Sequence, residues 1–354
     1  MWFSYLMLVV GLVVILVGCD VFTNSIEWLG KKLDLNEGVL GSIFAAVGTA
    51  LPETLIPIVA VVFAGSEADS HAHDVGIGAI IGAPFMLATL AMLVTGIAVF
   101  IFTAQRRRTL VMKVNSKILS RDIRFFLLAF AVALAAGFIS DQITKIVIAV
   151  GLVVYYAFYV YKHATDKSSH IESEDDIAED LSPLHFARKN ADPSLPIIVG
   201  QIFVGLALII GAAYLFVQYV SDVANSLGVT ALILSLIIVP IATELPEKFN
   251  SVLWVRRSKD TLALGNITGA MVFQSTLPVA FGLAFTDWTA NAEYAPAFAQ
   301  AALALVAASI LFGAMVWQKR LTARAMIFAG LWYIVWLILV FPFDLAKKVE
   351  NLGF

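Results

Sequence analysis

The chain has 354 residues and a net charge of −3, and 60% of its residues are hydrophobic whereas only 14% are charged. Soluble domains carry about 25% charged residues, so this composition excludes an ordinary soluble protein. No basic tract suggests nucleic-acid binding, and a single cysteine, Cys19, excludes an internal disulfide. We therefore expect an all-α protein, a polytopic transmembrane helical bundle surrounded by the lipid bilayer.

Apolar runs recur from end to end, and each is long enough to cross roughly 30 Å of hydrocarbon. In chain order they predict about ten spans, at residues 2–18, 37–64, 74–103, 123–139, 143–161, 195–220, 227–255, 261–285, 296–317 and 323–342. The first run has neither a basic segment at its start nor a small-residue cleavage site after it. We therefore expect a retained helix there and not a signal peptide.

Basic residues between the spans indicate an orientation. Lys and Arg gather at 106–124, 256–259 and 318–324, whereas the alternate connections at 65–73 and 286–296 contain none. Because cytosolic loops are enriched in Lys and Arg, this pattern predicts that both termini face outward. The short N-terminus and the single large linker favour the plasma (inner) membrane of a prokaryote.

The longest polar segment, residues 162–194, separates the fifth expected span from the sixth. Its clustered carboxylates suggest a regulatory calcium site, but they lack the Asp-x-Asp-x-Asp-Gly pattern of an EF-hand. Acidic cytosolic linkers of this kind are usually only solvated. The segment divides the spans into five and five, so we expect two repeats, at 1–161 and 195–354, joined by an acidic linker.

Two short motifs recur in the two halves. Residues 42–57 read SIFAAVGTALPETLIP and residues 236–251 read LIIVPIATELPEKFNS, and both contain Thr-x-Leu-Pro-Glu. A second matched pair follows, GAIIGAPF at 78–85 and GNITGAMVF at 265–273. By the orientation above, the halves cross the membrane in opposite directions. We therefore expect inverted repeats, an architecture that places a substrate site near the membrane midplane.

The repeated motif combines groups that bind hard cations. A carboxylate inside a membrane helix is costly and therefore indicates a function. The threonine and glutamate of each motif lie four residues apart, on one helix face, and the proline before each glutamate frees a backbone carbonyl one turn earlier. Such oxygens suit Ca²⁺, Na⁺ or Mg²⁺. The expected metal ligands are Glu53, Glu247, Thr49, Thr243, the carbonyls of Gly48 and Ala242, and also Glu244, Gln274 and Ser275.

At these residues the chain resembles the calcium/cation antiporter superfamily, particularly its sodium/calcium exchanger family. The family motif is close to Gly-Thr-Ser-Leu-Pro-Glu, followed in the next helix by Gly-Asn-x-x-Gly-Ser-Asn. The resemblance covers nearly the whole chain and implies an exchanger fold, with no enzyme activity and no cofactor. It implies that Ca²⁺ is exchanged for Na⁺ or H⁺, while spans one and six slide to give alternating access.

The chain departs from the family pattern at several positions. Glu244 stands where serine is usual, and the span-three motif GAIIGAP supplies no side-chain oxygen. Glu244 is interpreted either as a protonatable group or as the partner of Lys248 in an i,i+4 ion pair. Sodium and protons both remain open as counter-ions. The alternatives are exchange of another divalent cation, Mg²⁺ or Mn²⁺, and a non-exchanging channel or scaffold on the same fold; the oligomeric state stays unknown.

Overall fold

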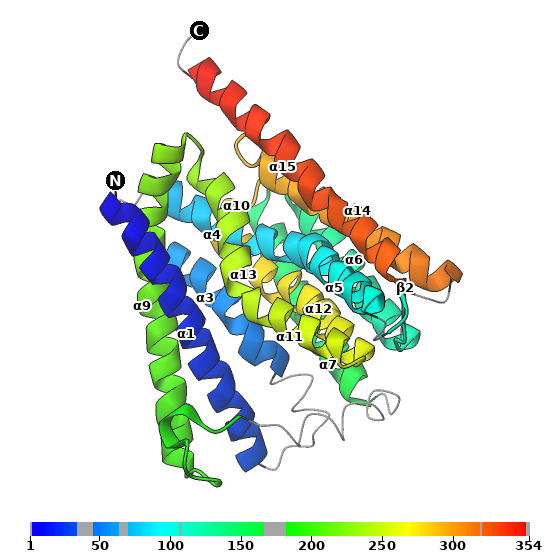
Figure 1. Cartoon of the computed structure of the whole chain (residues 1–354). Coiled ribbons are helices and arrows are strands. Elements are labelled where there is room, and N and C mark those ends of the chain that lie inside the picture. The colour runs from blue at the N-terminus through cyan, green and yellow to red at the C-terminus, as the bar shows by residue number, and fades with distance from the viewer. Residues whose placement is uncertain are drawn as a thin grey trace.

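The computed structural model describes residues 2–33, 45–63, 70–105, 108–165, 182–318 and 321–351. Some helix side chains, among them those of 45–52, 242, 245–247, 249–250 and 341–351, lie outside the described part. Figure 1 shows a bundle of helices. Its two described strands, β1 (Val111–Met112) and β2 (Leu321–Thr322), form one short antiparallel pair in which Val111 faces Thr322.

Each expected span coincides with a helix or with an interrupted helix. In chain order these are α1 (Trp2–Lys32), α3 (Ala45–Phe63), α4 (Ser70–Met86), the π-helix η2 (Leu87–Ala91), α5 (Met92–Ala104), α6 (Ser116–Ala136), α7 (Gln142–Thr165), the 3₁₀-helix η4 (His185–Ala187), α9 (Leu195–Leu227), α10 (Ala231–Thr243), α11 (Leu245–Arg256), α12 (Asp260–Gln274), α13 (Leu277–Phe285), α14 (Ala295–Gln318) and α15 (Ala323–Asn351). Within the described residues, 7 helical stretches are long and apolar enough to cross a membrane, and α3 and α10 add shorter apolar ones. The expected all-α membrane bundle is confirmed, whereas the count of ten spans and the inverted symmetry stay predictions.

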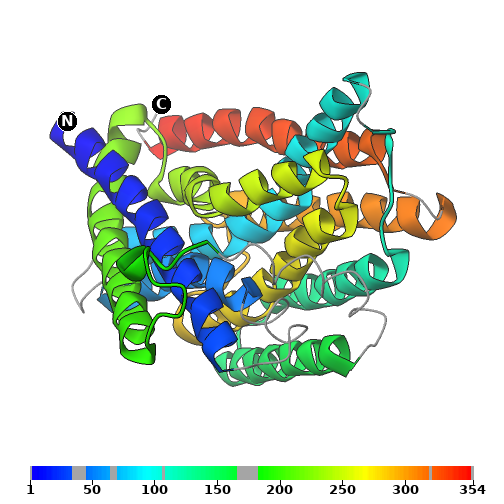
Figure 2. The ribbon, with the colours of Figure 1, turned by 60° about the horizontal axis from the view of Figure 1, so that its bottom comes forward.

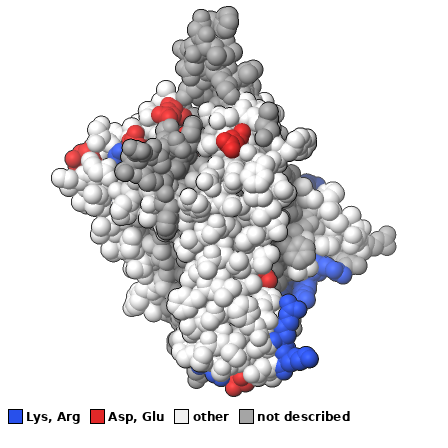
Figure 3. Space-filling model, turned by 90° about the vertical axis from the view of Figure 1, so that its left-hand side faces the viewer, with Lys and Arg blue, Asp and Glu red and all other residues white. Residues whose placement is uncertain are grey.

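Helices α1 and α9 run side by side along one edge of the bundle (Figures 1 and 2). They approach closely because Gly205 lies against Phe22: a Cβ atom at Gly205 would be 2.9 Å from the backbone nitrogen of Phe22. Small residues allow such close packing of membrane helices. The middle of the face that this pair presents is largely uncharged, with acidic residues near both ends and basic residues mostly near the lower end in the view (Figure 3). That distribution is typical of a surface in contact with lipid.

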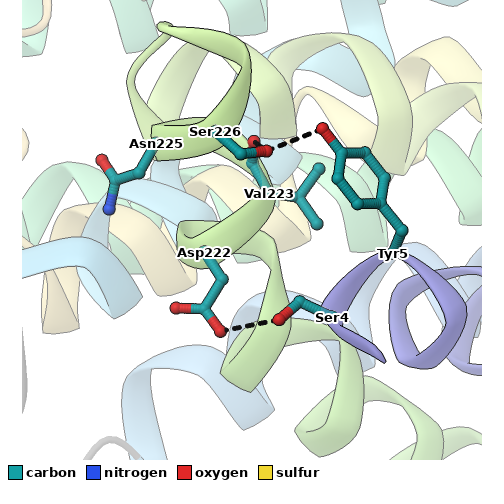
Figure 4. A pocket seen from close by; sticks show the side chains of 6 residues that line it. All are labelled: Ser4, Tyr5, Asp222, Val223, Asn225 and Ser226. Atoms are coloured by element: carbon teal, nitrogen blue, oxygen red, sulfur yellow. Dashed lines mark hydrogen bonds between the residues drawn. The ribbon is translucent and has the colours of Figure 1, made fainter. Parts of the chain in front are cut away.

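Polar contacts join α1 to α9 near the start of α1. The Ser4 hydroxyl donates to Asp222 Oδ2 over 3.0 Å, and the hydroxyls of Tyr5 and Ser226 are 2.7 Å apart. These side chains line a small cavity of about 210 Å³ (Figure 4). The two helices are therefore held together by hydrogen bonds as well as by apolar packing.

The carboxyl-terminal part of the acidic linker packs against the other end of this helix pair. Trp28 Nε1 donates to the carbonyl of Ser182 over 2.9 Å, and the backbone N–H of Phe186 donates to Gln201 Oε1 over 2.9 Å. Gln201 in turn donates to Asn24 Oδ1 over 3.0 Å. The carboxyl-terminal end of the linker is thus fixed to α1 and α9, while residues 166–181 lie outside the described part.

A buried ion pair joins the loop after α5 to the turn between α11 and α12. Both guanidinium NH groups of Arg108 lie 2.7 Å from the carboxylate oxygens of Asp260, and the two side chains are only 5% and 2% exposed. Arg108 also donates to the carbonyl of Val255, and Asp260 accepts the backbone N–H of Lys113. We call these four residues the Arg108 clamp, because together they fix the end of α11 and the start of α12.

The close contact of α4 with α10 gives a prediction about stability. A Cβ atom at Gly82 would lie 2.9 Å from the backbone oxygen of Leu236 and 2.7 Å from Pro240 Cγ. We expect Gly82→Val to separate these helices and to lower the free energy of unfolding by about 1–3 kcal/mol, measured by thermal unfolding in detergent. Gly211→Ala is the control, since nothing lies within 4 Å of a Cβ there. Equal unfolding midpoints for the two variants would contradict this packing.

Candidate cation site

The second motif lies where the seventh expected span is interrupted. Helix α10 ends at Thr243, Glu244 adopts φ −91° and ψ 3°, and α11 begins at Leu245. Pro246 follows at the second position of α11, where the absence of a backbone N–H is tolerated. The first motif differs, because α3 continues through Pro52 without a break. The structure thus interrupts one motif helix and leaves the other continuous.

Glu53 and Glu244 are buried deep in this apolar bundle. Their exposed fractions are 3% and 2%, and Thr243 beside Glu244 is only 1% exposed. Helix α3, which carries Glu53, packs against α4, α10, α12 and α13. Helix α3, which carries the first motif, therefore contacts helices that carry each of the other three motifs.

Several hydroxyl oxygens near the motifs keep lone pairs for a ligand. The Thr243 hydroxyl donates to the carbonyl of Val239 over 3.0 Å, and the Ser275 hydroxyl donates to the carbonyl of Val272 over 3.0 Å. A hydroxyl that donates its hydrogen to its own helix still has two acceptor lone pairs. The hydroxyl oxygens of Thr243 and Ser275 therefore retain lone pairs that can act as acceptors.

The ion pair considered for Glu244 is present. Lys248 Nζ lies 3.2 Å from Glu244 Oε2, and both side chains are buried. Glu244 and Lys248 therefore form a buried ion pair where α10 meets α11.

Helix α12, which carries the motif GNITGAM, is held from outside the candidate site. The hydroxyl of Thr268, inside this motif, donates to Asp122 Oδ2 over 2.9 Å, and the Tyr159 hydroxyl donates to Asp122 Oδ1 over 3.2 Å. These contacts fix α12 to α6 and α7. They position the motif without adding a ligand to the cation site.

The expected ligands are described to different extents. Glu53, Thr243 and Glu244 are buried as stated, and Gln274 and Ser275 are buried where α12 ends. Gly48 and Thr49 in α3, Ala242 in α10 and Glu247 in α11 occupy helical positions, but their side chains lie outside the described residues. Among the described residues, no three His, Cys, Asp or Glu side chains gather closely enough to hold a metal ion. The Glu247 carboxylate is not among these described side chains.

Three buried polar residues near the site were not expected from the sequence, namely Ser235, Gln300 and Tyr333. Pro240 cannot donate a backbone N–H, so the carbonyl of Leu236 is free of its helical bond, and Gln300 Nε2 lies 3.5 Å from it. Within the described part, Gln300 Oε1 has no hydrogen-bond partner. The available signal for Gln300 was an isolated polar residue within an apolar stretch, AFAQAALAL.

Interrupted membrane helices around buried carboxylates are typical of secondary transporters. The sequence profile of one transporter family, described as "Sodium/calcium exchanger protein", matches residues 3–162 and 197–341. The chain therefore belongs to this family, whose members are exchangers and not enzymes. The resemblance read from the motifs is confirmed.

Individual relatives agree with this assignment. The inner membrane protein YrbG of Escherichia coli is 23% identical over 320 residues, which cover 88% of each chain. The putative antiporter CaxA of Alkalimonas amylolytica is 24% identical over 75% of each chain. Among solved structures, the H⁺/Ca²⁺ exchanger CAX aligns with a TM-score of 0.72 and 16% identity, over 98% of this chain and 89% of that one. The sodium-calcium exchanger NCX_Mj aligns with a TM-score of 0.57 and 20% identity, over 96% and 99%. These structural similarities establish the fold.

Proposed function

We propose that this chain is a secondary active antiporter that moves Ca²⁺ across the membrane in exchange for Na⁺ or H⁺, by alternating access. The observation that carries the proposal is the burial of two carboxylates in the membrane bundle: Glu53 in the continuous helix α3, and Glu244 at the break between α10 and α11. Carboxylate, hydroxyl and carbonyl oxygens are the ligands that Ca²⁺ prefers. Glu53 and Glu247 are the central ligands, with Thr49 and Thr243 beside them.

The remaining ligands expected from the sequence complete this proposed site. Glu244 acts as a third carboxylate, the freed carbonyls of Gly48 and Ala242 add backbone oxygens, and Gln274 and Ser275 add neutral oxygens. The names of the two solved exchangers, one for H⁺ and Ca²⁺ and one for sodium and calcium, support both counter-ions equally. The transported cations are substrates, and the site needs no resident cofactor.

The proposal includes the arrangement in the membrane. Residues 1–161 and 195–354 would form inverted repeats of five spans each, with the linker 162–194 in the cytosol and both termini outside. The inner-membrane relative supports the plasma membrane of a prokaryote as the location.

The test is uptake of radioactive Ca²⁺ into proteoliposomes under an imposed sodium gradient or an imposed pH gradient. Accumulation under one gradient only supports exchange and identifies the counter-ion. Equal uptake without any gradient would indicate a channel. Uptake under neither gradient would contradict calcium exchange, and competition with Mg²⁺ and Mn²⁺ would then identify another divalent substrate.

A further inference from the structure

Lys248 occupies a position that is unfavourable for a lysine on two counts. It is 8% exposed, and an ammonium group taken out of water needs a compensating charge. It also lies in the first turn of α11, at the positive end of the helix dipole, where basic residues are destabilising. Among the described residues, its ammonium group has one ion-pair partner, Glu244 at 3.2 Å, and no hydrogen bond.

The pair of opposite charges is present in only one of the two motifs. The residues that correspond to Glu244 and Lys248 in the first motif are Ala50 and Thr54, which carry no charge. The second motif therefore contains an additional carboxylate together with an additional cation. The pair adds no net charge to the bundle, but it places a positive charge beside the candidate cation site.

We propose that Lys248 is a tethered cation: its ammonium group pairs with the Glu244 carboxylate when the site holds no transported cation, and a bound divalent cation displaces it. This inference rests on the proposed function, because it assigns Glu244 to the transport site. The lysine ammonium group is a compact charge on a flexible stem of four carbons, so it can move away from Glu244 without leaving the protein.

The tethered charge has two consequences for exchange. A divalent cation that binds Glu244 must break the Glu244–Lys248 pair, so Lys248 lowers the affinity for that cation by competition. When the site reorients across the membrane without a divalent cation, Lys248 already neutralises one carboxylate. The return step then needs one counter-ion fewer than the number of carboxylates would suggest.

The experiment is calorimetric titration of purified protein in detergent with CaCl₂, in sodium-free buffer at one fixed pH. Lys248→Gln should bind Ca²⁺ about tenfold more tightly than the unmodified chain, a coupling of the usual size for two competing binding events. Lys248→Arg should keep the weaker affinity, because it keeps the charge. Lys248→Met is the second variant, since it preserves the apolar stem if Lys248→Gln does not fold.

A double variant tests whether the effect passes through Glu244. Starting from Glu244→Gln, the further change Lys248→Gln should leave Ca²⁺ affinity unchanged within about a factor of two. Unchanged or weaker affinity in folded Lys248→Gln and Lys248→Met would overturn the tethered-cation proposal alone. If the unmodified chain binds none of Ca²⁺, Mg²⁺ and Mn²⁺, the proposed function fails, and this inference fails with it.

Discussion

Glu53→Gln is expected to reduce gradient-driven Ca²⁺ uptake by about 100-fold or more. Removing one partner of a buried charged interaction costs about 3–5 kcal/mol, because the other charge remains uncompensated. In this case the uncompensated charge is the transported cation in the loaded site. The amide of glutamine has nearly the shape of the carboxylate, so the bundle should still fold.

The measurement is the initial rate of radioactive Ca²⁺ uptake into proteoliposomes that contain equal amounts of folded protein. Glu293→Gln is the matched control, since Glu293 is exposed in the loop before α14 and should not affect transport. Uptake by Glu53→Gln within about threefold of the control would show that Glu53 is not a central ligand.

Arg108→Met is expected to lower the free energy of unfolding by about 3–5 kcal/mol, because it leaves the Asp260 carboxylate buried without its cation. Both side chains are almost fully buried and form two hydrogen bonds of 2.7 Å. Thermal unfolding in detergent should show a large decrease of the midpoint. Adding Asp260→Leu to Arg108→Met should recover much of the loss, because no unpaired charge then remains.

The exposed pair Lys32–Asp192 provides the control for this prediction. Its nitrogen–oxygen distance is also 2.7 Å, but the Asp192 side chain is 79% exposed. Asp192→Ala should therefore change stability by only about 0–1 kcal/mol. If Arg108→Met and Asp192→Ala had equal effects, the Arg108 clamp would not contribute to stability as its burial implies.

The sequence predicted the membrane helices well, because a run of apolar residues must be helical to satisfy its backbone in lipid. It also indicated a carbonyl freed by proline in each motif helix; the structure interrupts the second of these helices at Glu244 and leaves the first continuous. The helix α1 extends to Lys32, well beyond the expected end at residue 18, because hydropathy detects the apolar part of a helix and not its polar continuation. The π-helix η2 within the third span had no recognisable sequence signal.

Contacts between distant segments were not predictable from one sequence. Arg108 and Asp260 are separated by about 150 residues, and a charged residue is ordinary both in the loop that holds Arg108 and in the first turn of α12, where Asp260 lies. Gln300 and Ser235 are isolated polar residues within apolar stretches of α14 and α10, and the sequence does not show that these two helices pack against each other. The Glu244–Lys248 ion pair was one of two interpretations of Glu244, because i,i+4 spacing on a helix permits the contact. The sequence did not show that both side chains are buried.

The central claim is that the two repeated motifs surround one divalent cation. The most direct measurement is an anomalous difference map from crystals grown with Ca²⁺, recorded at a long wavelength where calcium scatters anomalously. We predict a peak within coordination distance, about 2.3–2.6 Å, of the carboxylates of Glu53 and Glu247. A bound calcium found only elsewhere, or none in crystals of protein that transports Ca²⁺, would contradict the claim.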